Sequence, residues 1–182
     1  LFRSVDDKGM NTNLIKSIKG ISFVYTTPSH QYPLGGILPI QRRLELIKCA
    51  TENDYYIIED DYDSEFRYEG QPISSLYELS PNKVIYIGSF SKILSPAIRV
   101  GFMLLPDNIL ESYKTLKMYS DVHTETILQH VLAGFIGNGG LEKYIFRMKK
   151  LYNRKRKYLI KVLNTEFKNE FKIKGEAAGL HI

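Results

Sequence analysis

The sequence predicts an α/β fold in which a mixed, mostly parallel sheet is flanked by helices. Short runs rich in β-branched and aromatic residues alternate with segments of helical periodicity, as expected when helices connect successive strands. The runs at residues 55–58 and 83–88 are apolar on both faces, as in strands of a sheet that is covered on both sides. The 182 residues are 43% hydrophobic, which is sufficient for a buried core.

Within residues 1–167, four strands and four helices are expected, and turn-forming residues separate them. The expected strands are residues 21–26, 55–58, 83–88 and 100–105. The expected helices are residues 39–51, 107–118, 123–137 and 140–167. Pro39 suits the first turn of its helix. Asp107 is a candidate N-cap, because its carboxylate can accept a hydrogen bond from a free backbone amide.

The elements suggest more than one domain. Residues 1–140 are expected to form part of a large domain, residues 141–167 a connector helix, and residues 168–182 the start of a smaller α+β domain. Residues 171–173 and 179–182 have the composition of strands. The chain begins without an initiator Met and stops inside such a run, so we expect it to be a segment of a longer protein.

Composition excludes several classes of protein. No run approaches the roughly 20 apolar residues that span a bilayer, and the first residues do not form a secretory signal. A cytoplasmic location without a membrane partner is therefore expected. The single cysteine, Cys49, cannot form an internal disulfide and is expected to be a small buried thiol.

Positive charge gathers on the last expected helix, although the formal net charge is only +5. The basic residues are Lys149, Lys150, Arg154, Lys155, Arg156, Lys157 and Lys161. Such a run raises the question of nucleic-acid binding. It carries no aromatic stacking platform, zinc-finger spacing or helix-turn-helix signature, and basic stripes on long helices are usually solvated. We therefore expect a solvated helix face.

A lysine follows one predicted strand in a turn of small residues. Ser89-Phe90-Ser91-Lys92 comes directly after strand 83–88, and Arg99 follows the lysine by seven residues. Small hydroxyl residues let an anion approach the backbone, and an arginine fork can bind a phosphate bidentately. An amine beside an anion site is what Schiff-base chemistry with a phosphorylated aldehyde needs. For any single lysine, the alternative is a solvated loop residue.

Acidic residues follow another predicted strand, at the edge of the sheet where α/β proteins bind ligands. Asp60 could pair there with a protonated pyridine nitrogen, and Tyr62 supplies a hydroxyl close by. The alternatives are a metal site or a plain acidic strand end. We expect no metal, because neither a histidine nor a spaced third ligand accompanies these acids. Asp61 and Asp63 are expected to serve local turns, and His123, His130 and His181 show no ligand spacing.

These motifs resemble a known family. Ser89-Phe90-Ser91-Lys92 with Arg99 is similar to the cofactor-lysine motif of class I/II aminotransferases, which share the type I pyridoxal-phosphate, aspartate-aminotransferase-like fold. The strings TPSHQYPLG at residues 27–35 and EDDYDSEFRY at residues 59–68 resemble one branch, the MocR-type transcriptional regulators. In these, an aminotransferase-like domain follows a winged-helix DNA-binding domain of the GntR type.

The resemblance implies roles for individual residues. It implies that pyridoxal 5′-phosphate is the cofactor and that Lys92 holds it as a Schiff base. It also implies that Asp60 binds the pyridine nitrogen and Tyr62 the phenolic oxygen of the ring. Ser89, Ser91 and Arg99 would face the phosphate.

One loop departs from the aminotransferase pattern. Aminotransferases carry Asn-Pro-x-Gly there, and their Asn reaches the ring oxygen, whereas Tyr32 precedes Pro33 in this chain. Gln31 or His30 could take over that contact, or both could be structural loop residues. The glycine-containing phosphate loop and ring-stacking aromatic of the family would precede residue 1, and its substrate-binding arginine would follow Ile182.

Three functions are compatible with these residues. In a sensor, a small amine or amino-acid effector would exchange onto the cofactor and change what an attached DNA-binding domain can do. In an aminotransferase, Lys92 would shuttle a proton between the substrate and the cofactor. A degenerate fold kept for dimerisation is the third. The strings at residues 27–35 and 59–68 favour the sensor, with a homodimeric full-length protein and the basic helix at most an auxiliary patch near DNA.

Overall fold

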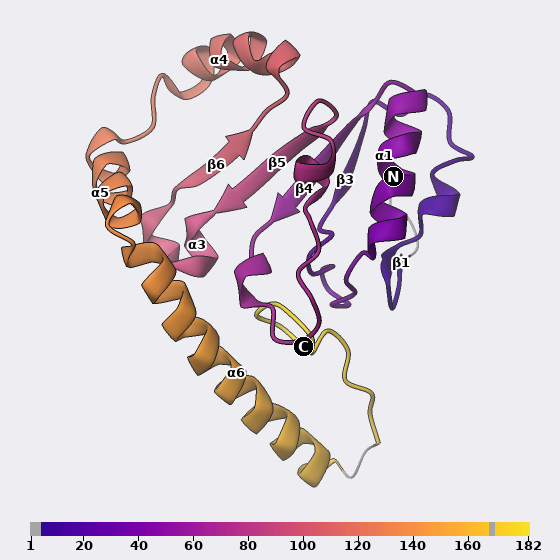
Figure 1. Ribbon diagram of the computed structural model, residues 1–182, viewed down its shortest axis with the longest axis vertical. Coiled ribbons are helices and arrows are strands. Elements are labelled where there is room, and N and C mark those ends of the chain that lie inside the picture. The colour runs from indigo at the N-terminus through magenta and orange to yellow at the C-terminus, as the bar shows by residue number, and fades with distance from the viewer. Residues whose placement is uncertain (1–4, 168–169) are drawn as a thin grey trace.

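The computed structural model describes residues 5–167 and 170–182, and a four-stranded sheet lies at its centre (Figure 1). The strands lie in the order β3 (Phe23–Thr26), β4 (Tyr56–Asp61), β5 (Val84–Ser89) and β6 (Gly101–Leu104). The first three are parallel, and β6 is antiparallel to β5. The prediction of a mixed, mostly parallel sheet is confirmed. A separate two-stranded ribbon pairs β1 (Val5–Asp6) with β2 (Gly9–Met10).

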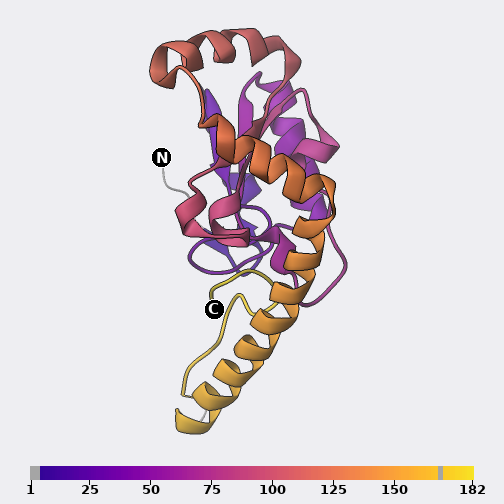
Figure 2. The same ribbon diagram turned by 90° about the vertical axis from the view of Figure 1, so that its left-hand side faces the viewer.

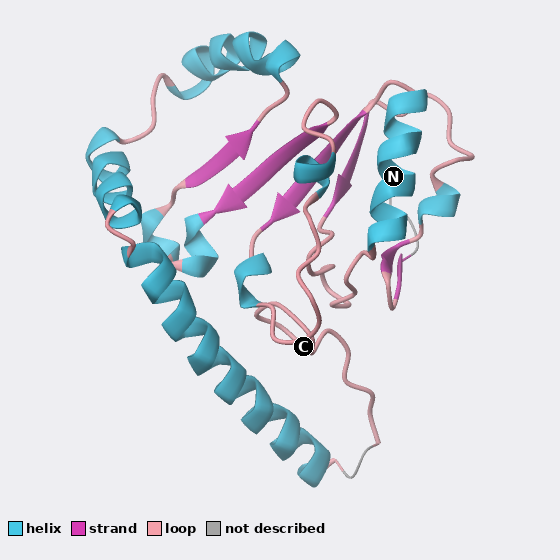
Figure 3. Ribbon diagram, in the orientation of Figure 1, coloured by secondary structure: helices cyan, strands magenta, loops and turns pink. Residues whose placement is uncertain are grey.

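The four expected helices are present (Figure 3). They are α1 (Ile40–Glu52), α4 (Asp107–Asp121), α5 (Thr126–Gly137) and α6 (Gly140–Glu166), and two short helices, α2 (Leu76–Leu79) and α3 (Phe90–Ile93), lie between the strands. Asp107 is not the N-cap of α4. Pro106 occupies that position, and Asp107 is the first helical residue, where its carboxylate faces the positive end of the helix dipole. No helix in the described residues combines the length and hydrophobicity needed to cross a membrane.

The hydrophobic core lies between α1 and one face of the sheet. Leu46 and Ala50 of α1 are fully buried together with Ile57 of β4 and Val84 of β5. Burial of each large apolar side chain in this layer contributes about 1.5–3 kcal/mol. Cys49 is 7% exposed in the same cluster, so the expected buried thiol is confirmed.

The other face of the sheet is less covered than the apolar runs predicted. On β3, Phe23 and Tyr25 are 59% and 52% exposed. They share their face with Tyr56 and Ile58 of β4, their partners in the parallel register. In the part of the chain that the structure describes, this face is therefore open to solvent or to further protein.

Strand β4 continues through the acidic residues where the sequence predicted its end. Backbone pairing extends to Asp61 opposite Gly88 of β5. Because side chains alternate along a strand, Glu59 and Asp61 point into the buried face, whereas Asp60 points to the opposite face. The fold thus gives three consecutive acids two different environments.

The end of the chain returns to the sheet without forming strands. Figure 2 shows α6 running along one side of the molecule and extending beyond the sheet, with the final segment beside it. The strands predicted at residues 171–173 and 179–182 are wrong, because a strand needs a ladder of paired residues, and the described end of the chain forms a single isolated bridge, between Ala178 and Arg67.

The side of α6 that faces the sheet is anchored at two points. The Tyr152 ring meets Phe66 edge-on, with centroids 5.3 Å apart. Arg156 pairs with Glu69 at 3.0 Å and lies over the Tyr68 ring. The prediction that all basic residues of this helix are solvated is therefore wrong for Arg156.

Candidate functional site

A cavity of about 470 Å³ lies at the carboxyl ends of β3 and β4, beside α3. It is lined by Asp60 at the end of β4, by Tyr62 directly after that strand, and by Lys92 of α3. Tyr25, Thr27 and Gln31 contribute from the β3 side, and Leu180 and His181 close the wall from the end of the chain. The topology explains this convergence, because the carboxyl ends of parallel strands open at one edge of a sheet.

Asp60 is held in place by a phenol from the neighbouring strand. The Tyr25 hydroxyl donates a hydrogen bond to Oδ2 of Asp60. Burial and the neighbouring Asp60 carboxylate raise the pKa of Tyr25 to about 12, so the phenol keeps its proton at neutral pH. This leaves the second oxygen of Asp60, Oδ1, able to accept a hydrogen bond from a ligand.

Tyr62 presents a protonated phenol to the same cavity. Its hydroxyl donates to the backbone oxygen of His30 at 3.0 Å. Burial raises the pKa of Tyr62 well above its usual value, and the nearby carboxylates of Asp63 and Asp60 add to the effect. Tyr62 is therefore a donor that can also accept a hydrogen bond through its free lone pair.

Lys92 lies in the short helix α3, which begins directly after β5. The Ser89 hydroxyl caps this helix by accepting from the Ser91 backbone amide at 3.1 Å. The cap fixes the turn that carries Lys92 to the cavity. Among the described residues, no carboxylate lies within ion-pair distance of the Lys92 amine, which leaves it available to a ligand.

Three predicted phosphate contacts lie outside the cavity wall. Ser89, Ser91 and Arg99 do not line it, and the hydroxyl of Ser89 already accepts a hydrogen bond. Arg99 is exposed and has a left-handed backbone, with φ of 53°, at the end of a short 3-10 helix. Such a conformation is uncommon for a residue with a side chain, and it follows the tight turn at Pro96.

The two residues that could take over the contact of the aminotransferase Asn, Gln31 and His30, lie in different positions. Gln31 lines the cavity, and its side-chain amide donates to the Tyr32 backbone oxygen at 3.1 Å. His30 is 1% exposed and does not line the cavity. Its Nδ1 lies 3.1 Å from Oδ2 of Asp63, and its Nε2 lies 3.3 Å from the Gly175 oxygen.

Asp63 and His30 together fasten the end of the chain to the site. Oδ2 of Asp63 also accepts a hydrogen bond from the Leu180 backbone amide at 3.0 Å. Gly179, with φ of +75°, packs so closely that a Cβ there would lie 1.7 Å from His30 Nδ1. Asp63 therefore makes a long-range contact, and the prediction that it serves a local turn is wrong.

We expect Asp63→Ala to destabilise the protein by about 2–4 kcal/mol. The change leaves the buried His30 ring and the Leu180 amide without their acceptor. Asp63→Asn is the matched control, because its amide oxygen can still accept from Leu180, and it should lose less. Urea unfolding at neutral pH measures both variants. A loss below about 1 kcal/mol for Asp63→Ala would contradict this role.

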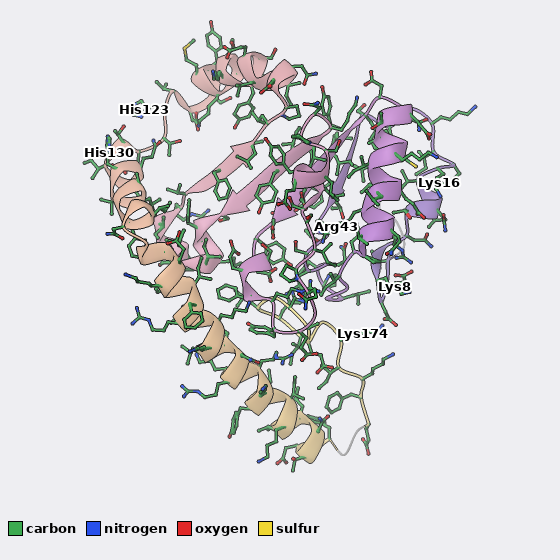
Figure 4. All side chains as sticks on the ribbon, viewed as in Figure 1. Lys8, Lys16, Arg43, His123, His130 and Lys174 are labelled. Carbon is green, nitrogen blue, oxygen red and sulfur yellow. The ribbon has the colours of Figure 1, made fainter. Side chains whose placement is uncertain are left out.

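His181 completes a group of three potential metal ligands that the sequence did not suggest. One atom each of His30, Asp63 and His181 lie within 4.8 Å of one another. However, both nitrogens of His30 already face protein oxygens, and the His181 ring stacks on His30 with centroids 4.0 Å apart. This packing favours a structural cluster that is held by the hydrogen bonds of His30 and Asp63. Figure 4 shows His123 and His130 at the periphery, away from the cluster.

The pH dependence of stability should reveal His181. Burial lowers the pKa of its imidazole below 6.5, and the neighbouring His30 and Lys92 act in the same direction. The unfolded chain then binds this proton more readily than the folded chain, so the wild type should lose stability relative to His181→Phe as the pH falls below about 6.5. Unfolding at several pH values measures the difference. If the difference in unfolding free energy between the wild type and His181→Phe stayed constant between about pH 5 and 7, the pKa of His181 would not be lowered in the folded protein.

Among solved structures, one close counterpart is a kynurenine aminotransferase. The Pyrococcus horikoshii enzyme, solved in complex with PMP, superimposes with a TM-score of 0.87 at 31% identity. The match covers 96% of this chain and 46% of that one. The fold is therefore the type I fold of pyridoxal-phosphate-dependent aminotransferases.

This chain belongs to the family described as aminotransferase class I and II, which matches residues 5–181. The uncharacterized HTH-type transcriptional regulator YdeL of Bacillus subtilis is 44% identical over 182 residues, which are 98% of this chain and 38% of the relative. The probable rhizopine catabolism regulatory protein MocR of Rhizobium meliloti is 32% identical over 160 residues, 87% of this chain and 32% of the relative. The resemblance to MocR-type regulators is confirmed, and the chain spans well under half the length of these relatives.

Proposed function

We propose that this chain is the effector-sensing, pyridoxal-phosphate-binding part of a MocR/GntR-type transcriptional regulator. The observation that carries the proposal is the meeting of the Lys92 amine, the Asp60 carboxylate and the Tyr62 phenol on one cavity. The regulator YdeL, 44% identical over nearly the whole chain, supports the regulatory role.

The donor set fits the cofactor. Pyridoxal phosphate, when bound, supplies an aldehyde that condenses with amines and a pyridine ring that withdraws electrons. Lys92 offers the amine, and the free Oδ1 of Asp60 can accept from a protonated ring nitrogen and keep it charged. The Tyr62 phenol keeps its proton and can hydrogen-bond the oxygen substituent of the ring.

The phosphate contacts form the second part of the proposal. Ser89, Ser91 and Arg99 are the residues that the family motif assigns to the phosphate. Arg99 is exposed in the turn that follows α3 and can reorient its guanidinium toward a dianion. Gln31 on the cavity wall is proposed as the residue that replaces the Asn of aminotransferases.

The remaining chain residues order the site and limit access to it. Tyr25 fixes the orientation of the Asp60 carboxylate. Leu180 and His181, fastened through Asp63, form the wall from which a small amine or amino-acid effector would be contacted. A ligand that binds one position of this wall better than another shifts the population of protein conformations, which is what a sensor requires.

The partners follow from the regulatory role. We propose that DNA binds through a winged-helix domain outside these residues and that the protein acts in the cytoplasm as a homodimer. Apolar surface on α5 supports an interface, because Ile127 and Val131 are 75% and 60% exposed.

A catalytic aminotransferase is the second candidate. It is supported by the likeness to the Pyrococcus horikoshii kynurenine aminotransferase. In that case Lys92 would take a proton from the substrate carbon and return it, which requires the amine to move within the same cavity. Both candidates use the same residues and differ in turnover.

One experiment separates the candidates. The full-length protein is titrated with pyridoxal phosphate and then with a panel of amines and amino acids, while absorbance, duplex binding and oxo-acid formation are recorded. A sensor shows spectral changes and altered duplex binding without oxo acid. Steady oxo-acid formation would favour the aminotransferase, and spectra that are unchanged by pyridoxal phosphate would reject both.

A further inference from the structure

Six basic residues form one unbroken line along α6. Lys143, Arg147, Lys150, Arg154, Lys157 and Lys161 are spaced alternately by four and three residues, so they share one face of the helix. All six are exposed. At 1.5 Å per residue the line is about 27 Å long. We call these six residues the basic stripe.

Among the described residues, no acidic side chain pairs with the basic stripe. On α4, Lys114 pairs with Glu111 and Lys117 pairs with Asp121. Within residues 5–167 and 170–182, none of the six stripe residues has such a partner, and the one contact of their charged groups is Lys150 over the Phe146 ring at 4.2 Å. Like charges four residues apart destabilise a helix. A polyanion bound along the stripe would relieve this repulsion.

The opposite side of α6 anchors the helix to the domain. Tyr152 packs on Phe66, and Arg156 pairs with Glu69. The Tyr144 hydroxyl donates to the Leu94 backbone oxygen at 3.2 Å. The stripe thus faces outward. A helix that lies in a lipid surface inserts a continuous apolar side among acyl chains, whereas the side of α6 opposite the stripe contacts the domain through Tyr152 and Arg156.

We propose that the basic stripe contacts the phosphates of duplex DNA as an auxiliary surface of the regulator. This inference rests on the proposed function, because it needs DNA held nearby by another domain. Six cations in a row without intervening acids match the regular negative charge of a duplex backbone. Such contacts add affinity and position the domain on the duplex, but they do not read its sequence.

The test compares two neutralised variants of the full-length protein. The stripe variant carries Arg147→Gln, Lys150→Gln, Arg154→Gln and Lys157→Gln. The control variant loses the same charge elsewhere, through Lys19→Gln, Lys48→Gln, Lys114→Gln and Lys155→Gln, which are all exposed. Binding to a fluorescent random-sequence duplex of about 40 base pairs is measured by anisotropy over a range of salt concentrations. Circular dichroism checks that both variants are folded.

We expect the stripe variant to bind at least about tenfold more weakly than the control at roughly 0.1 M salt. The slope of log affinity against log salt should become shallower by about 3.6, because each of the four lost phosphate contacts removes about 0.9. Equal affinity and slope for the two variants would overturn the inference and leave the proposed function intact. Failure of the wild type to bind any duplex would instead reject the proposed function and the inference with it. If the stripe variant loses only its binding to vesicles containing phosphatidylserine, the stripe is a lipid surface and the inference is wrong.

Discussion

Lys92→Ala is expected to abolish the covalent adduct between the protein and pyridoxal phosphate. Lys92 is the only lysine that lines the described cavity, and Asp60 and Tyr62 line the same space. Without the Lys92 amine, none of the lining residues offers the cofactor aldehyde a lysine with which to form a Schiff base. Any residual binding is then non-covalent. Borohydride reduction followed by peptide mass spectrometry measures the adduct in the full-length protein.

The control for this prediction is Lys155→Ala, an exposed lysine on α6. It should form the adduct to the same extent as the wild type, with the label on Lys92. A variant lacking Lys92 that still gave one adduct per chain at another lysine would contradict the assignment.

Glu59→Ala is expected to destabilise the protein by about 3–5 kcal/mol, the largest effect on stability predicted for any residue of the sheet. Glu59 is fully buried, and its carboxylate accepts from the Leu76 and Tyr77 backbone amides at 3.0 and 2.9 Å. It also lies 3.7 Å from the buried guanidinium of Arg43. Removal of the carboxylate leaves the buried Arg43 cation without its counter-charge and two backbone amides without their acceptor.

The Arg43 side chain makes this effect spread beyond β4. Arg43 donates to the backbone oxygens of Leu38, Ser74 and Pro28, so it joins the loop before α1 to the segment before α2. Burial raises the pKa of the Glu59 carboxyl and lowers that of Arg43, and their mutual attraction opposes both shifts.

Urea unfolding compares the variants Glu59→Ala, Glu59→Gln and Glu52→Ala with the wild type. Glu59→Gln keeps an amide oxygen for one backbone donor and should lose less stability than Glu59→Ala. Glu52→Ala removes an exposed carboxylate and should change stability by less than about 0.5 kcal/mol. Equal losses for Glu59→Ala and Glu52→Ala would show that the buried pair has no such role.

The main sheet and the long helices could be predicted from the sequence because their signals are local. The β-branched and apolar runs of β3, β4 and β5 and the periodicity of α6 depend on neighbouring residues alone. The end of β4 could not be placed, because charged residues read as a strand boundary. Pairing of Asp61 with Gly88 of β5 overrides that local signal.

The candidate site was predictable only in part. Lys92, Asp60 and Tyr62 were identified through motifs, and the structure brings them to one cavity. Tyr25 was missed, although its place on β3 beside β4 gives it the same face as Asp60. A prediction of strand order and register would have found it.

The contacts at the end of the chain could not be predicted. His181 stacks on His30, far from it in the sequence, and Asp63 reaches Leu180 at a separation of 117 residues. No spacing or periodicity encodes such a contact, because the residues become neighbours only when α6 carries the final segment back to the sheet. Residues 171–173 and 179–182 do not form the predicted strands, because the returning segment makes one isolated bridge and no ladder with the rest of the described chain.

A crystal structure of the full-length protein with pyridoxal phosphate would show whether Lys92, Asp60 and Tyr62 hold the cofactor together. We expect continuous density between the cofactor and Nζ of Lys92, with Oδ1 of Asp60 beside the ring nitrogen and the Tyr62 hydroxyl beside the ring oxygen. Cofactor bound elsewhere, or a Lys92 amine that points away from Asp60 and Tyr62 while the cofactor is present, would contradict it.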